Sequence, residues 1–297
     1  MKKILVYLES SSLGDTISVL PYVDKFAQHN QNDEVFFSTE NWFIPYIQKV
    51  CSNVKCIGRD TNFIYDKKID LKYFDCSKPI QKAYAQQLGF IDAPYIRPEI
   101  YFEPKEKPIK NKYVTLGIHS TSQLKYWNHP SGEKSQPDSP YWNDLCNLLR
   151  KDGITPVVVE QYELFGPKTF KNGLPKRANK KIGLPFSESL NYIYHSEFFI
   201  GLSSGLSWVA HSLGKPVVMI SNFTEDWNEF DINSSDYLRL TNKSVCHGCW
   251  NKINKDFVFD VNDWYWCPLH KGTSRQFECH TSITPEFVMS EIKKWKF

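Results

Sequence analysis

Four cysteines near the carboxyl terminus are the most specific chemical signal in the chain. Cys246 and Cys249 stand at CxxC spacing, seventeen residues separate Cys249 from Cys267, and eleven separate Cys267 from Cys279. Thiolates at this spacing are typical ligands of a tetrahedral ion, zinc or a single iron. We therefore predict a closed structural metal module over residues 246–279, against the alternative of four unrelated thiols. Neighbouring histidines are alternative ligands: His247, His270 and His280.

A short polar loop near the amino terminus is a second candidate site. It ends in Gly14 and Asp15 and follows an apolar run at residues 4–8. Open α/β sheets bind ligands at the carboxyl ends of strands, where a carboxylate can take a proton from a hydroxyl nucleophile. The alternative is that Asp15 caps the following helix. The loop lacks the Gly-Lys-Ser/Thr ending of a P-loop and the repeated glycines of a dinucleotide fingerprint.

Two further loops follow predicted strands in the second half of the chain. Ser203, Ser204 and Gly205 open a predicted helix, whose first amides can seat a diphosphate; the alternative is an ordinary serine cap. Lys125 follows the strand at 113–118 and can neutralise a departing phosphate as a compact cation. The alternative for this lysine is a solvated surface position.

Alternating strands and helices must position these loops. The predicted strands are 4–8, 34–38, 113–118, 154–159, 197–202 and 217–220. The predicted helices are 16–29, 42–50, 139–152, 187–195, 206–213 and 285–295. This alternation is typical of parallel α/β sheets, and residues 92–112 are a Pro- and Lys-rich linker. We predict two Rossmann-like domains, 1–108 and 109–297, with an exposed insertion at 131–138.

Composition excludes several classes of protein. With 297 residues and 41% hydrophobic content, the chain can bury one large core or two ordinary ones and is not disordered. Its net charge is +3 with scattered basic residues, so nucleic acid is not the expected partner. No apolar run approaches the roughly 18 residues of a membrane span, and Glu9 interrupts the amino-terminal run before it reaches signal-peptide length. We expect a cytoplasmic protein and leave its oligomeric state open, with a homo-oligomer among the alternatives.

The chain resembles the bacterial autotransporter heptosyltransferases, which are related to the lipopolysaccharide heptosyltransferases. The resemblance runs through most of the chain and rests on the motifs at 8–21, 120–128, 200–208, 214–218 and 246–283, above all the stretch from Trp266 to Cys279. It implies an α/β fold of the GT-B glycosyltransferase class with two Rossmann-like domains. It also implies ADP-heptose as donor, hydroxyl groups of a protein as acceptor, and iron in the four-cysteine site.

The resemblance also assigns roles to individual residues. Asp15 resembles the general base of the family and Lys125 its phosphate-binding lysine. The nucleotide loop is matched by Ser203, Ser204, Gly205 and Leu206. We place Thr16 and Thr121 in the same donor site. The expected activity is inverting heptosyl transfer to a protein, with transfer to a glycan or non-catalytic binding of a nucleotide sugar as alternatives.

Overall fold

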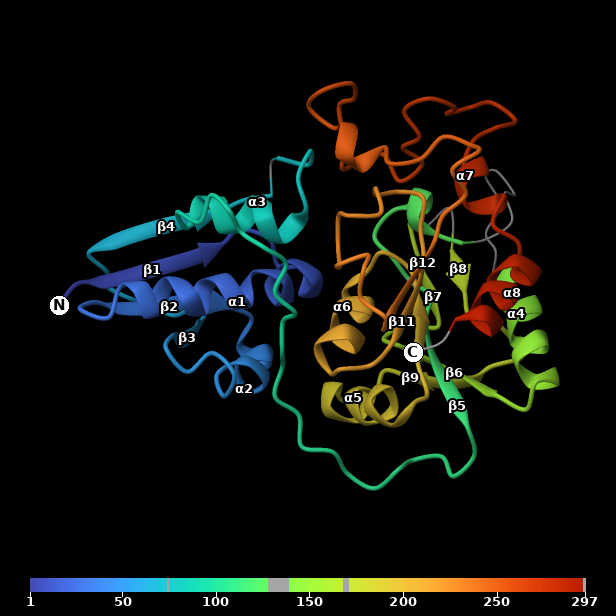
Figure 1. Ribbon diagram of the computed structural model, residues 1–297, viewed down its shortest axis with the longest axis horizontal. Helices are drawn as coiled ribbons and strands as arrows, with labels where there is room; N and C mark the ends of the chain where they lie inside the picture. The colour runs from blue at the N-terminus through green and yellow to red at the C-terminus, as the bar shows by residue number, and fades with distance from the viewer. Residues whose placement is uncertain (74, 128–138, 168–170, 296–297) are drawn as a thin grey trace.

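Two parallel sheets lie side by side in the computed structural model, which describes residues 1–73, 75–127, 139–167 and 171–295 (Figure 1). The predicted insertion at 131–138 lies outside these residues. Residues 92–112 connect the halves without a helix or strand, and the expected division at 108/109 falls within this segment. The chain therefore has the predicted α/β class, with one sheet on each side of the linker.

The first half is a four-stranded parallel sheet in the order β3-β2-β1-β4. Its strands are β1 (Lys3–Leu8), β2 (Glu34–Thr39), β3 (Lys55–Gly58) and β4 (Lys67–Leu71), and its helices are α1 (Leu13–His29), α2 (Ile44–Ile47) and α3 (Ile80–Gln87). Ile4, Leu5 and Val6 are all buried, as expected of a parallel strand covered on both faces. The central position of β1 directs the loop before α1 toward the other half.

One predicted helix of the first half is wrong in its extent. We expected a single helix at 42–50, and the structure has a short 3-10 helix, Asn41–Phe43, followed by the four-residue α2. Pro45 lacks the N–H that would continue a helical ladder from the preceding turn. The segment is therefore divided into two short turns.

The second half is a six-stranded parallel sheet in the order β12-β11-β10-β5-β6-β9. Its strands are β5 (Tyr113–Gly117), β6 (Thr155–Glu160), β9 (Asn179–Ile182), β10 (Phe199–Gly201), β11 (Val217–Ile220) and β12 (Tyr237–Leu240); a separate hairpin pairs β7 (Leu164–Phe165) with β8 (Asn172–Gly173). Its helices are α4 (Pro140–Lys151), α5 (Phe186–His195), α6 (Gly205–Ser212), α7 (Glu278–Thr281) and α8 (Pro285–Lys294). Since β5 and β10 are neighbours, the strand order reverses between them, which is where doubly wound sheets bind ligands.

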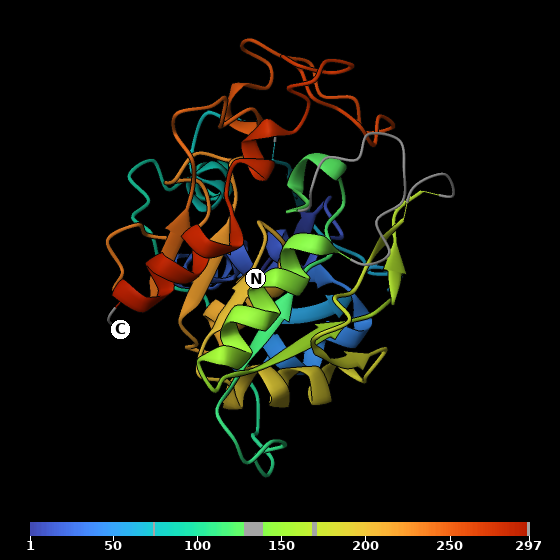
Figure 2. The same cartoon turned by 90° about the vertical axis from the view of Figure 1, so that its right-hand side faces the viewer.

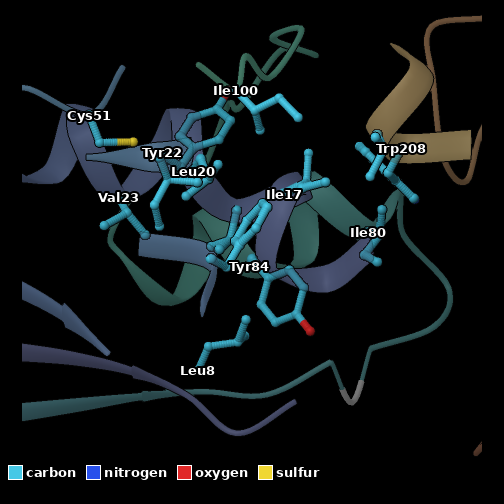
Figure 3. Close-up of a cluster of buried hydrophobic side chains, with 14 of the residues drawn as sticks. Leu8, Ile17, Leu20, Tyr22, Val23, Cys51, Ile80, Tyr84, Ile100 and Trp208 are labelled. Carbon is cyan, nitrogen blue, oxygen red and sulfur yellow. The ribbon is translucent and has the colours of Figure 1, made fainter. Parts of the chain in front are cut away.

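A continuous apolar cluster joins the two halves. It contains Ile17 and Ile80 from the first half and Phe199 and Trp208 from the second. Figure 3 shows Trp208 of α6 projecting toward Ile80, and the Tyr84 ring with its hydroxyl turned away from the apolar side chains. The halves are thus held by a shared core and not by the linker alone.

After β12 the chain largely loses regular structure. Between β12 and α8 the structure has one short 3-10 helix, Trp250–Lys252, and the four-residue α7. Both views place this irregular segment at one end of the molecule and the linker at the opposite end (Figure 1, Figure 2). None of the helices in the described ranges is long and apolar enough to cross a membrane.

Candidate functional site

A cavity of about 1260 Å³ lies between the two halves and is lined by residues of both. Asp15 lines it from the first half, and Lys125 and Thr121 line it from the loop after β5. The loop after β10 contributes a third group: Ser203, Ser204, Gly205 and Leu206. The structure therefore brings together, around one space, every predicted donor-site and catalytic residue except Thr16.

Thr16 points away from this space. It is 3% exposed, and its hydroxyl donates to the Ser12 carbonyl one turn earlier at 2.9 Å. The prediction placed Thr16 with the donor, in the stretch 13–16 where the first strand gives way to the first helix. Adjacent residues on a helix face different directions, so the turn that brings Asp15 to the cavity takes Thr16 into the helix packing.

Ser12, and not Asp15, caps α1. Its side chain accepts a hydrogen bond from the Asp15 amide at 3.1 Å, which satisfies a free donor of the first turn. The Asp15 carboxylate accepts a hydrogen bond from the Ser10 hydroxyl. Tyr84 also lines the cavity; burial is the main cause that raises the pKa of its phenol, and the negative charge of Asp15 raises it further. The carboxylate is thus not used as the helix cap and lines the cavity, where the Ser10 hydroxyl donates to it.

Lys125 lies on the short 3-10 helix Gln123–Lys125, across the cavity from Asp15. Its Nζ is 4.9 Å from the centre of the Phe223 ring. Burial lowers the pKa of this ammonium, while the charges of Glu229 and Asp15 act in the opposite direction. Among the described residues no carboxylate oxygen lies within 4.0 Å of Nζ, so the cation is placed to meet an anionic ligand.

The amino-terminal ends of α1 and α6 meet at the cavity. A Cβ at Gly205 would lie 3.0 Å from the Leu13 Cβ and 3.4 Å from the Gly14 nitrogen, so the absence of a side chain permits this approach. Ser204 occupies the cap position of α6, and its buried hydroxyl has no partner among the described residues. Both helix ends present free amides and a partial positive charge, which favours a phosphate between them.

Sequence reasoning missed the carboxylate behind the α6 loop. Glu229 is 4% exposed and accepts hydrogen bonds from Ser203 at 2.5 Å, Thr224 at 2.7 Å and Arg239 at 2.7 Å. These contacts commit the Ser203 hydroxyl to the protein and fix the start of the loop. Ser203 and Glu229 are 26 residues apart, and no short motif relates them.

A second buried carboxylate, also missed, lies at the other end of the cavity. Glu160 ends β6 and accepts hydrogen bonds from the amides of Ile118 at 2.6 Å and His119 at 2.8 Å. Burial raises the pKa of Glu160 to about 7, although the two amides act to lower it. Burial also lowers the pKa of the neighbouring His119 to about 4. The sequence of β6 before Glu160 is apolar, and nothing in it indicated that the last residue of the strand would face the cavity.

The carboxyl-terminal cysteines come close to one another. Cys249, Cys267 and Cys279 are buried, and Cys246 is partly exposed. A hydrogen bond to Cys279 lowers the pKa of Cys246 to about 6, and His270 acts in the same direction. Within the described ranges, the group with donor atoms close enough to hold a metal is Cys246, His270 and Glu278. The structure thus gathers metal-ligating side chains here, with His270 beside the first cysteine, while the predicted four-thiolate set is not established by this geometry.

Comparison with known proteins gives the family. No family model matches the chain. It is 30% identical to the autotransporter heptosyltransferase BAHTCr of Citrobacter rodentium, over 99% of this chain and 71% of that protein. It is 31% identical to the autotransporter heptosyltransferase Aah of Escherichia coli, over 98% of this chain and 74% of that protein.

Solved structures agree with these relatives. The iron-containing dodecameric glycosyltransferase TibC of enterotoxigenic E. coli aligns with a TM-score of 0.87 at 26% identity, covering 99% of this chain and 76% of TibC. TibC in complex with ADP-D-beta-D-heptose aligns with a TM-score of 0.85 over the same shares of the two chains. The E. coli lipopolysaccharide heptosyltransferase II, at 12% identity and a TM-score of 0.64 over 99% of this chain and 98% of that one, shares the GT-B-like fold. The chain therefore belongs to the autotransporter heptosyltransferases and is a glycosyltransferase.

Proposed function

We propose that the protein transfers heptose from ADP-heptose to a hydroxyl group of a protein acceptor, with inversion at the anomeric carbon. The observation that carries this proposal is the placement of Asp15 and Lys125 in one cavity, on opposite halves of the chain. A base and a phosphate-binding cation on opposite sides suit attack on a sugar from the face opposite its leaving group. The TibC complex with ADP-D-beta-D-heptose supports the identity of the donor.

Asp15 is the proposed general base. Its carboxylate takes the proton of the acceptor hydroxyl as the oxygen forms a bond to the anomeric carbon. The bond from that carbon to the diphosphate oxygen breaks, and its electron pair leaves with ADP. Because Ser12 caps the helix, the Asp15 carboxylate is available for this proton.

Lys125 and the first turn of α6 are the proposed seat of the diphosphate. Negative charge grows on the leaving phosphate in the transition state, and a preplaced ammonium and helix amides stabilise it without rearrangement. Ser204, with its unpartnered buried hydroxyl, supplies one further donor at this end of the cavity. Thr121 lines the cavity on the same loop as Lys125.

We propose that Cys246, Cys249, Cys267 and Cys279 hold one structural iron, with zinc as the chemical alternative. The residues fit a soft or borderline ion, since sulfur is the ligand that such ions prefer and three of the four thiols are buried together in one segment. TibC is iron-containing, which supports iron. The ion would hold the irregular segment together, and no step of the transfer passes through it.

We also propose an assembly state and a cellular location, from the comparison with TibC and from the free cysteines. TibC is dodecameric, and we propose that this chain also forms a homo-oligomer, which light scattering coupled to size-exclusion chromatography would measure. The four cysteines outside the proposed metal site, Cys51, Cys56, Cys76 and Cys146, are free thiols, which is the usual state in a reducing cytoplasm. We therefore propose that the enzyme acts there, on its acceptor before export.

Intact-mass spectrometry tests the proposed function. The purified protein is incubated with ADP-heptose and an autotransporter passenger protein. In two parallel mixtures, UDP-glucose replaces ADP-heptose, or a glycan replaces the passenger protein. A heptose increment on the protein only in the first mixture supports the proposal. An increment on the glycan alone would reassign the acceptor, and transfer from UDP-glucose alone would reassign the donor.

A further inference from the structure

The loop that carries Lys125 rests on the cysteine module, residues 246–279. Gln123 is 6% exposed, and its backbone N–H donates to the Trp264 backbone carbonyl at 3.1 Å. The Trp264 indole N–H donates in return to the Gln123 side-chain oxygen at 3.1 Å. These two hydrogen bonds join Gln123, two positions before Lys125, to Trp264 in the middle of the module.

The next two residues contact the same region. Leu124 is 1% exposed and belongs to one apolar cluster with Cys249 and Cys279. Lys125 lies over Phe223, and the Phe223 carbonyl accepts a hydrogen bond from the Trp250 amide at 3.0 Å. Leu124 is therefore packed against module residues directly, and the Lys125 side chain lies on a residue, Phe223, that is itself bonded to the module.

The contacts continue beyond the lysine. The Tyr126 ring centre lies 6.1 Å from that of Trp264. The Trp127 indole N–H donates to the Ile283 carbonyl at 2.7 Å, just after the module ends. Gln123, Leu124 and Tyr126 thus contact the module and Trp127 contacts a residue just beyond it, whereas Lys125 is linked to the module through Phe223.

We propose that the cysteine module is the platform that holds Lys125 in the donor site, with Gln123 and Trp264 as positioning residues. A three-residue 3-10 helix has little stability of its own, and a lysine side chain is flexible, so the position of the ammonium depends on what supports the loop. The module therefore has a second task besides its own folding. The inference rests on the proposed function in one respect, the binding of diphosphate by Lys125.

ADP affinity measured by isothermal titration calorimetry tests the platform. Trp264→Phe removes the indole donor to Gln123 while keeping an aromatic ring beside Tyr126. Loss of one such hydrogen bond is expected to raise the Kd for ADP about three- to tenfold. Hydrogen exchange of the peptide covering 119–127 should become faster in the same variant, which reports on the loop without any turnover.

Trp266→Phe is the matched control. It also removes an indole hydrogen bond, but that bond joins Trp266 to Val258 at 2.9 Å inside the module. Its Kd for ADP is expected to stay within about twofold of the original, since the Gln123–Trp264 hydrogen bonds remain and a phenylalanine ring still fills the apolar cluster that Trp266 shares with Leu124. Equal weakening by both variants would show a general loosening of the module and would overturn the assignment of Trp264.

Lys125→Ala separates this inference from the proposed function. If Lys125→Ala weakens ADP binding while Trp264→Phe leaves both affinity and exchange unchanged, the platform is overturned and the role of the lysine stands. If Lys125→Ala binds ADP as the original protein does, the lysine is not the diphosphate ligand. Exchange at 119–127 then still decides whether the module holds the loop.

Discussion

At the start of α1, one residue caps the helix and a different residue presents its carboxylate to the cavity. Ser12 satisfies the free amide of the first turn, and Asp15 faces the cavity. This division means that helix stability and proton transfer can be changed separately. Because Ser12 caps the helix, the Asp15 carboxylate can lie in the first turn without bonding to the helix amides.

Asp15→Asn is expected to lower heptosyl transfer by at least about 100-fold with an unchanged melting temperature, because the amide cannot take a proton. Ser12→Ala is the control for helix stability and should cost about 1 kcal/mol through loss of the cap. Transfer is followed by intact mass, and unfolding by circular dichroism. Near-normal transfer by Asp15→Asn would rule out its role as the base.

Glu160 makes stability depend on pH. Its pKa is about 7 when folded against an ordinary 4.5, so the folded chain retains a proton that the unfolded chain releases. Stability therefore falls as pH rises from 4.5 to about 7 and then levels off. Glu160→Gln keeps an acceptor oxygen for the two amides and should be more stable than the original above about pH 8, by as much as about 3 kcal/mol.

Urea unfolding at a series of pH values, without nucleotide, measures this effect. Glu163→Gln is the control, since Glu163 lies between β6 and β7, its side chain is 67% exposed, and it pairs with Lys180 at the surface. It should leave the pH profile almost unchanged. Parallel pH profiles for the original protein and Glu160→Gln would contradict the assignment.

At the scale of elements, the segment between β12 and α8 has little regular secondary structure to hold it. It is rich in aromatic residues but has only two short helices, so it buries a small cluster without a regular backbone frame. A metal tied to four thiolates would replace that frame, and binding would be coupled to local folding.

Cys246→Ser is expected to lose the metal, to lower the melting temperature and to speed hydrogen exchange across the module. Cys56→Ser is the control, because Cys56 lies on β3, in the other half of the chain. Elemental analysis by mass spectrometry gives iron and zinc per chain. His270→Ala should keep the metal if four thiolates hold it, whereas metal loss in that variant would assign His270 as a ligand.

At the scale of the whole molecule, a shared core and a close approach of two helices help to unite the two sheets. The apolar cluster crosses between them, and α1 approaches α6 through Gly14 and Gly205. Gly14 and Gly205 therefore line the cavity and also form the contact between the two halves. Packing at this contact sets the distance between Asp15 and the α6 loop.

Gly14→Ala tests this junction. A Cβ at Gly14 would lie 3.0 Å from Trp208 Cδ1, and Trp208 is 3% exposed within the core. Overpacking is expected to cost about 1–3 kcal/mol, which exceeds the gain of about 1 kcal/mol from replacing glycine in a helix. Denaturant unfolding should show a net loss of stability; a rise would mean that helix propensity outweighs the contact with Trp208.

The strands and loops whose signals are local could be predicted from the amino-acid sequence. The apolar runs predicted β1, β2, β6 and β11 to within about two residues at either end, since such runs are buried on both faces of a parallel sheet. The loops after β1, β5 and β10 were placed in the site because parallel strands end at one edge of a sheet. The short strands β3 and β4 were not predicted, because β4 (Lys67–Leu71) is mostly polar and β3 (Lys55–Gly58) has only four residues.

The side chains that support the site could be identified only once the packing of the two halves was known. Glu229 reaches Ser203 across 26 residues, and Trp264 reaches Gln123 across 141. No spacing rule links positions so far apart, because such contacts are set by how the sheets and the cysteine module pack. Tertiary packing also turned Thr16 away from the cavity and gave the helix cap to Ser12 in place of Asp15. Sequence could name the polar groups at the strand ends, but their directions and partners depend on backbone geometry that forms only when both halves close on a common core.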